Sequence, residues 1–175
     1  MGNKGLFILV EGDDDERFFN RVVNPQFTGK YDWVKPYKYA QVKPENIRKF
    51  IHSISAMQAD YIIVADSNDS PCITARKEKL LNGKFKEIDR NRIQLVIREI
   101  EGWYLAGLND KARKEVGIKN KTDLNTDNLT KEDFNRLKPQ TYSRIDFMQE
   151  ILKRFDISTA RENNRSFDYF CNKYL

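Results

Sequence analysis

The sequence is poor in cysteine and histidine, the residues on which many metal sites and nucleophilic sites are built. Its two cysteines, Cys72 and Cys171, lie far apart in the 175-residue chain and have no spacing typical of a metal site. Two reduced thiols are what we expect of a cytoplasmic protein. The one histidine, His52, lies in a helical pattern among polar neighbours. A single histidine excludes a His-rich zinc site and argues against His-based catalysis.

Long apolar runs and glycine-rich loops are also missing. No apolar run approaches the roughly 20 residues that a membrane-spanning helix needs. The first residues lead directly into a strand pattern, so we expect neither a membrane span nor a signal peptide. No Gly-rich phosphate loop follows a predicted strand, which argues against a small-molecule phosphotransfer or nucleotide-binding protein. Hydrophobic residues make up 39% of the chain and charged residues 33%, as in a polar, soluble domain that can bury a core.

The feature that organises the sequence is a short apolar run followed by acidic residues. Residues 6–10 are apolar and of strand length, and Gly12 ends the run. Residues 13–16 are all acidic, which is typical of the first turn of a helix. This pattern places Glu11 at the carboxyl end of a buried strand, and Asp15, one helical turn further on, can face the same point. In open α/β sheets, ligands bind at that edge.

A second apolar run ends in the same way. Residues 61–65 predict a strand, and Asp66, Asn68 and Asp69 follow it. If the two strands are parallel neighbours, these side chains meet Glu11 at one edge of one sheet. Clustered carboxylates repel each other unless a hard cation lies among them, and oxygen ligands of this kind suit Mg²⁺ or Mn²⁺. The alternative interpretation is that strand ends are simply acidic.

The order of predicted elements indicates an α/β fold with a mostly parallel four-stranded sheet and helices on both faces. Strands are predicted at about 6–10, 31–42, 61–65 and 92–97, and helices at about 13–23, 44–57 and 71–81. Beyond them, short helices are expected within 107–140, and amphipathic helices at 142–154, with Ile145, Met148, Ile151 and Leu152 inward, and at 165–174. The C-terminal helices are expected to cap the sheet, and no boundary divides the predicted single domain of residues 1–175.

Basic residues outnumber acidic ones, with a net charge of +5, and they gather away from the acidic strand ends. The stretch 31–42 alternates aromatic residues with lysines and contains a proline, which predicts an edge strand. Its basic side chains could neutralise single-stranded nucleic acid, or they could block edge-to-edge aggregation. The third helix is basic on its exposed side. The candidate nucleic-acid-binding residues are Lys35, Lys38, Lys43, Arg76, Lys77 and Lys79.

The first motif carries a resemblance to a known family. The run Leu-Phe-Ile-Leu-Val-Glu-Gly-x-x-Asp of residues 6–15, with the later strand that ends in an Asp-centred cluster, resembles a TOPRIM domain. This fold occurs in topoisomerases, bacterial primases, the small 5S-RNA maturation nuclease and OLD-family nucleases, and the resemblance covers about residues 5–105. The segment Glu-Ile-Glu-Gly-Trp-Tyr-Leu-Ala at 99–106 and the terminal Ser-Phe-x-x-Phe at 166–170 further resemble small standalone TOPRIM-like proteins.

The resemblance implies roles for individual residues. Glu11 matches the family glutamate, a general acid or base and, in nucleases, a metal ligand. Asp66 matches the first aspartate of the Asp-x-Asp pair, a Mg²⁺ ligand. The second position of that pair is Asn68, which offers an oxygen but no charge, and Asp69 could substitute for it. Asp15 matches an acidic position of OLD-type nucleases, and Glu101 could supply a further ligand.

These roles predict Mg²⁺-dependent or Mn²⁺-dependent phosphoryl transfer on nucleic acid. The leading hypothesis is a nuclease that acts in RNA processing or phage defence. Because position 68 has lost a charge, the alternative is a catalytically weak TOPRIM-like module that binds nucleic acid or a partner protein. The sequence leaves open whether the partner is another protein or a second copy of the chain.

Overall fold

The computed structural model describes residues 4–119 and 124–175, and it divides into two compact units, residues 1–95 and 96–175. The first unit contains the sheet, except for Val96 at the end of the last strand, and the three helices that follow its first three strands. The second unit is helical. The predicted single domain of residues 1–175 stays a prediction. Within the described ranges, no helix is long and apolar enough to cross a membrane.

The first unit is built on a four-stranded sheet in the order β2-β1-β3-β4. β1 pairs in parallel with both β2 and β3, and β2 lies at an edge, which confirms the predicted α/β fold and the predicted edge strand. The four strands are β1 (Gly5–Val10), β2 (Trp33–Lys38), β3 (Asp60–Asp66) and β4 (Ile93–Val96).

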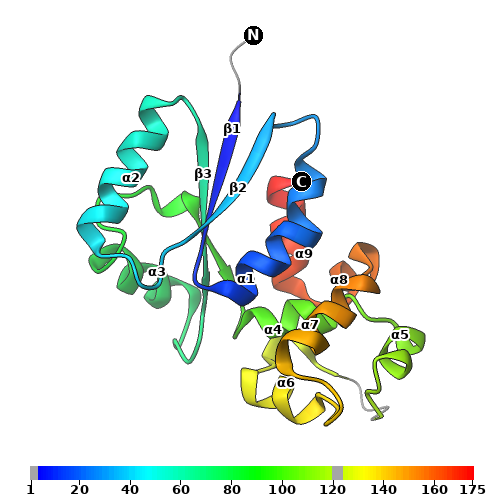
Figure 1. The fold of residues 1–175 in the computed structure, drawn as a ribbon. Helices are drawn as coiled ribbons and strands as arrows, with labels where there is room; N and C mark the ends of the chain where they lie inside the picture. The colour runs from blue at the N-terminus through cyan, green and yellow to red at the C-terminus, as the bar shows by residue number, and fades with distance from the viewer. Residues whose placement is uncertain (1–3, 120–123) are drawn as a thin grey trace. The chain divides into compact units, whose positions relative to one another are not determined.

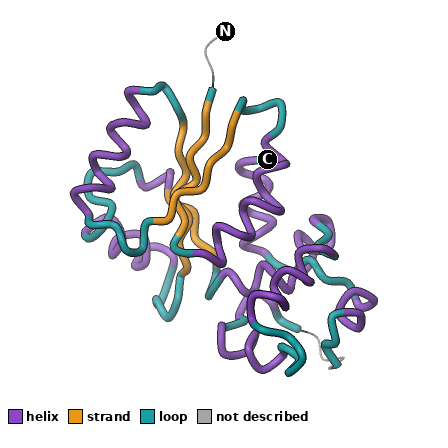
Figure 2. The backbone as a smooth tube through the Cα atoms, in the orientation of Figure 1, coloured by secondary structure: helices purple, strands orange, loops and turns teal. Residues whose placement is uncertain are grey.

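One face of the sheet is covered by α2 (Pro44–Ala56) and α3 (Ile73–Asn82), which Figures 1 and 2 show on the same side of the strands. Side chains alternate between the two faces of a strand, so every second residue of β1 points to this side. The core here joins residues of the sheet to both helices: Leu9, Tyr39, Ile47, Ile51, Ile54, Ile63, Ala65, Leu80, Phe85, Ile93 and Leu95. The helix predicted at about 44–57 ends at Ala56, and Met57, which follows it, is 50% exposed.

The other face belongs to α1 (Asp13–Phe18), which continues as a π-helical turn (Phe19–Val23) and a 3₁₀ turn (Asn24–Phe27). The inward residues of β1 on this side, such as Ile8 and Val10, are fully buried. The predicted helix at about 13–23 has a buried inner face, formed by Phe18, Phe19, Val22 and Val23. The two helical layers fix the sheet between them and leave its carboxyl edge to the loops.

The second unit packs six α-helices of the described residues: α4 (Ile100–Ala106), α5 (Asp110–Glu115), α6 (Lys131–Leu137), α7 (Arg144–Lys153), α8 (Ile157–Asn163) and α9 (Arg165–Tyr174). Short helices within 107–140 were predicted, and residues 120–123 of that stretch lie outside the described residues. α8 was not predicted. The predicted inward position of Ile145 is wrong, since it is 52% exposed. The buried stripe of α7 contains Phe147, which places Ile145 on the opposite side of the helix.

The two sequence segments that resemble standalone TOPRIM-like proteins pack against each other in this unit. Trp103 of α4 lies 5.1 Å from Phe167 and 5.5 Å from Phe170 of α9, between ring centroids. Its indole N–H donates a 2.8 Å hydrogen bond to Ser166 Oγ. Gly102 is required beside it, because a Cβ atom there would lie 2.5 Å from the Thr126 carbonyl oxygen. The two motifs therefore hold the helical unit together.

Candidate functional site

Glu11 and Asp66 meet at the carboxyl edge of the sheet because β1 and β3 are parallel neighbours. Leu9 of β1 is in register with Ile63 of β3, so both strands end at the same level. The backbone N–H of Asp66 donates to Glu11 Oε1 at 3.3 Å. The predicted meeting of these two residues at one edge therefore agrees with the structure.

Asp15 turns back to the same edge from the first turn of α1. The backbone N–H of Gly12 donates to Asp15 Oδ2 at 3.1 Å, and the residue is only 5% exposed. Free backbone N–H groups and the helix dipole favour a carboxylate at this position. Glu11, Asp15 and Asp66 are called the carboxylate edge below.

Tyr39 contacts the carboxylate edge through its hydroxyl group, and the sequence did not identify it as a site residue. Its buried hydroxyl lies 3.3 Å from Glu11 Oε1 and 3.0 Å from the Val64 carbonyl oxygen, and donates its hydrogen to one of them. Burial raises the pKa of Tyr39 well above its usual value, and the charges of Glu11, Asp15 and Asp66 raise it further. The hydroxyl therefore stays protonated. Its position directly after β2 was the available signal, because β2 ends at the same edge.

Arg76 supplies the positive charge at this edge. Its Nη2 group donates to Glu11 Oε1 at 3.3 Å, and its Nε group donates to the Asp66 carbonyl oxygen at 2.8 Å. Only 12% of the side chain is exposed. The sequence placed Arg76 on the solvent face of α3, but Leu80, one helical turn further on, is buried on the same side. Its role in nucleic-acid binding stays a prediction.

Asn68 and Asp69 lie in the turn that follows β3. The turn is closed by a hydrogen bond from Ser70 N to Ser67 O at 3.2 Å, and both residues are exposed. Asn68 adopts a left-handed backbone conformation, with φ 49°, which asparagine tolerates better than most residues. Both residues line a pocket of about 430 Å³ together with Ser70, Pro71, Ala75, Arg76 and Lys79.

The carboxylate edge is not a ready-made cage for a metal ion. Across residues 4–119 and 124–175, no three His, Cys, Asp or Glu side chains are grouped so as to hold one. The chemistry of the donors still fits Mg²⁺, which proteins commonly bind through one or two carboxylates while water and substrate phosphates complete the shell. Glu11 and Asp66 are two such carboxylates, and the Tyr39 hydroxyl, the Asp66 N–H and Arg76 Nη2 each lie 3.3 Å from Glu11 Oε1.

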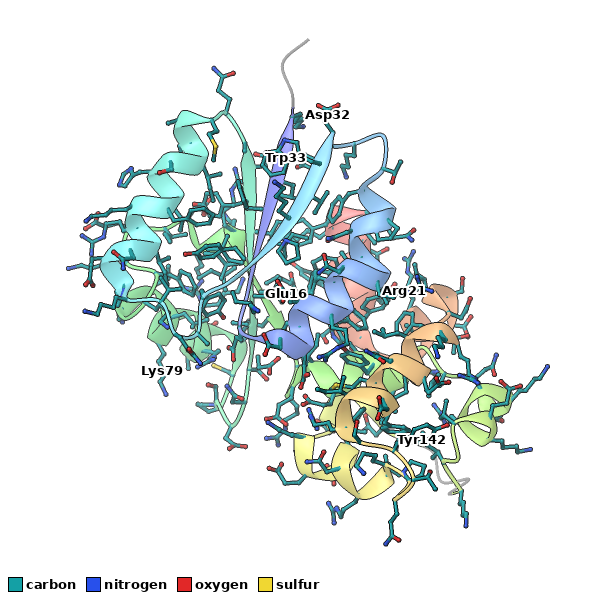
Figure 3. All side chains as sticks on the ribbon, in the orientation of Figure 1. Glu16, Arg21, Asp32, Trp33, Lys79 and Tyr142 are labelled. Atoms are coloured by element: carbon teal, nitrogen blue, oxygen red, sulfur yellow. The ribbon has the colours of Figure 1, made fainter. Side chains whose placement is uncertain are left out.

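The predicted basic residues differ in what surrounds them. Lys38 pairs with Asp13 at 2.7 Å and with Glu16 at 3.0 Å, and these partners raise the pKa of Lys38. Lys35 is exposed, with its ammonium 5.6 Å from the centroid of the Trp33 ring. Figure 3 shows Lys79 projecting away from α3. The remaining two are Lys43, which is exposed at the start of α2, and Lys77, which is half-buried on α3.

Glu101 belongs to the second unit, where it lies in the first turn of α4 and is 4% exposed. It forms an ion pair with Arg144 of α7. Burial raises the pKa of Glu101, although Arg144 opposes that shift. The predicted role of Glu101 as a metal ligand stays a prediction.

Comparison with known proteins supports the fold. No protein-family model matches the chain, and no curated protein is significantly similar to it. A solved structure is similar: the C-terminal region of the Burkholderia pseudomallei OLD protein, with a TM-score of 0.52 and 15% sequence identity. The match covers 97% of this chain and 98% of that one. At this identity the likeness shows the fold alone, and over nearly its whole length the chain has the α/β fold of that OLD region.

Proposed function

We propose that this protein is a Mg²⁺-dependent or Mn²⁺-dependent nuclease that hydrolyses phosphodiester bonds in DNA or RNA. The observation that carries the proposal is the position of Glu11 at the carboxyl edge of a parallel sheet, where it contacts the Tyr39 hydroxyl and the Asp66 backbone, with Asp15 in the adjoining first turn of α1. Ligands of open α/β sheets bind at this edge. The likeness in fold to the C-terminal region of an OLD protein supports the same proposal.

The residues of the edge divide the work between them. In this proposal Glu11 and Asp66 hold the ion, and Asn68 or Asp69 adds an oxygen from the turn. A bound divalent ion supplies stabilisation of charge on the phosphate and a water that ionises more easily. Tyr39 and the Asp66 N–H orient the Glu11 carboxylate, which can then hold the ion or accept a proton from the attacking water. Glu101 is left out of this site because it is only 4% exposed, whereas the Glu11 side chain is 29% exposed.

A specific observation favours a second candidate, a module of weak or no catalytic activity that binds nucleic acid or a partner protein. Arg76 already neutralises Glu11, and position 68 carries an amide where the TOPRIM pattern has a carboxylate. An edge with less negative charge attracts a divalent ion less strongly. The two candidates differ in whether the protein cleaves what it binds.

The test is a cleavage assay on labelled single-stranded and double-stranded DNA and RNA, with Mg²⁺, Mn²⁺ or EDTA. The nuclease proposal predicts cleavage with Mg²⁺ or Mn²⁺, none with EDTA, and loss of cleavage in Glu11→Gln. Asp13→Asn is the matched control, since it removes a carboxylate two residues along the chain, at the start of α1, that pairs with Lys38 outside the carboxylate edge. Preference for RNA would favour a role in RNA processing, and preference for DNA a role in phage defence. Binding without cleavage under every condition would favour the second candidate.

A further inference from the structure

Arg76 is held firmly at one point and loosely at another. Its Nε group donates to the Asp66 carbonyl oxygen at 2.8 Å, a short and favourable distance. Its contact with Glu11 Oε1 is 3.3 Å, longer than the usual range for a charge-assisted hydrogen bond. The contact with Glu11 is therefore the weaker of the two, and a small shift of the planar guanidinium can lengthen it while Nε stays near the Asp66 carbonyl oxygen.

The positive charge of Arg76 lies where it would repel a divalent ion bound to Glu11. An ion that binds the Glu11 carboxylate must approach a positive charge that already lies against that carboxylate. Because Arg76 is only 12% exposed, water screens this repulsion incompletely. The free protein should therefore bind Mg²⁺ or Mn²⁺ weakly until the charge of Arg76 is satisfied elsewhere.

The pocket of about 430 Å³ offers that second place, because Arg76 lines it as well. Lys79 lies three residues further along α3, on the same side, and lines the pocket too. Asp69 contributes an opposing negative charge. No aromatic ring occurs among the described residues of the lining, so the pocket suits a phosphate group better than a stacked base.

We propose that Arg76 exchanges between Glu11 and a nucleic-acid phosphate in this pocket, so that the phosphate and the divalent ion bind cooperatively. The inference rests on the proposed function, and it adds an order of events to it. A backbone phosphate that binds Arg76 and Lys79 removes positive charge from Glu11. The carboxylate edge then accepts the ion beside the bound strand. Arg76 is thus a positioning residue that restricts ion binding to the substrate-bound protein.

The test measures Mn²⁺ affinity by titration calorimetry, with and without a single-stranded oligonucleotide whose phosphorothioate linkages resist cleavage. In the wild type, the oligonucleotide should raise Mn²⁺ affinity about tenfold, a usual size for coupling between two sites. Arg76→Met should bind Mn²⁺ about tenfold more tightly than the wild type without the oligonucleotide, and should gain little when it is added. Lys79→Met should keep wild-type Mn²⁺ affinity in the free protein. It should lose most of the increase in Mn²⁺ affinity that the oligonucleotide causes in the wild type.

The outcomes separate this inference from the proposed function. Equal or weaker Mn²⁺ binding in Arg76→Met would overturn the inference and leave the nuclease proposal standing. If Arg76→Met does not fold, the Lys79→Met comparison decides, and an undiminished gain in that variant overturns the inference. Absence of Mn²⁺ binding in every protein would overturn the proposed metal site and the inference with it.

Discussion

Each unit of the molecule contains a glutamate that pairs with an arginine of a helix further along the chain, and the two pairs differ in burial. In the second unit, Glu101 is 4% exposed, and its partner Arg144 also lies over the Phe134 ring at 5.1 Å. In the first unit, the Glu11 side chain is 29% exposed and its contact with Arg76 is 3.3 Å long. A pocket also lies beside Arg76. The Glu101–Arg144 pair is buried and fixed, whereas Glu11 and Arg76 can each bind another partner.

This difference separates a structural ion pair from a reactive one. A buried carboxylate in an ion pair is fixed there by the high cost of leaving its charge unpaired. A half-exposed carboxylate with three long contacts can accept a new ligand at a smaller cost. From the comparison we expect changes at Glu11 to affect chemistry and changes at Glu101 or Arg144 to affect stability.

The largest expected effect is on cleavage by Glu11→Gln. The amide keeps the shape of the side chain but cannot act as a base or as a charged ligand, so the rate should fall about 10³-fold. Nucleic-acid binding should remain nearly intact, because the backbone contacts of the strand are unchanged. Single-turnover cleavage and a filter-binding assay measure the two quantities. Equal loss of binding and rate would mean that Glu11 holds the strand itself.

The next effect is on stability, through Arg144→Met. Removal of one partner leaves the Glu101 charge buried and should lower the free energy of unfolding by about 3–5 kcal/mol. Arg76→Met should cost only about 1 kcal/mol, because Glu11 is 29% exposed and keeps its contacts with the Tyr39 hydroxyl and the Asp66 N–H. Urea unfolding at pH 7 gives both values. Equal losses of stability in the two variants would contradict the distinction between the buried Glu101–Arg144 pair and the partly exposed Glu11–Arg76 pair.

The pH dependence of Arg144→Met gives a further check with a definite sign. Burial raises the pKa of Glu101 in the folded protein above that of the unfolded chain. A raised carboxyl pKa favours the folded state at low pH, and this contribution is lost as the pH rises through the folded pKa. Arg144→Met removes a partner that lowers the pKa. The variant should therefore recover part of its lost stability when the pH is lowered from 7 towards 5.

A smaller effect is expected from Tyr39→Phe. The folded pKa of Tyr39 is raised, so its contribution to stability is fully present below about pH 10 and is lost as the pH rises through the folded pKa. The variant should lose about 1 kcal/mol at pH 7, for one hydrogen bond, and fall less steeply in stability above pH 10. Tyr31→Phe is the control, because burial raises the pKa of Tyr31 to about 12 away from the carboxylate edge. Of these two tyrosine variants, only Tyr39→Phe should alter Mn²⁺ binding.

The smallest expected effect concerns two lysines that the sequence grouped together. Lys79→Ala should reduce the salt dependence of single-strand binding by about 0.7 in the log–log slope, the value for one lost phosphate contact. Lys38→Ala should change the slope much less, because Asp13 and Glu16 already bind its ammonium group. Binding isotherms at several salt concentrations measure the slopes. A larger change in Lys38→Ala would place the strand along β2 instead of α3.

The sequence predicted the sheet and the meeting of Glu11 with Asp66 because both follow from local patterns. Apolar runs of strand length that alternate with helical patterns specify a parallel sheet, and parallel strands end at one edge. Tyr39 was missed because its position directly after β2 becomes informative only once β2 is known to lie beside β1 and to end at the same edge. Arg76 was placed on the surface with its basic neighbours, although the helical period that buries Leu80 also turns Arg76 inward.

The most direct test of the proposed metal site is anomalous diffraction from crystals of the wild type soaked in Mn²⁺ with a cleavage-resistant oligonucleotide. Mg²⁺ lies about 2.1 Å from its oxygen ligands, and we expect Mn²⁺ at a similar distance from carboxylate oxygens of Glu11 and Asp66. A peak at that position, absent in crystals of Glu11→Gln, is the predicted result. A protein that cleaves nucleic acid with Mn²⁺ while the peak lies away from the carboxylate edge would contradict the account.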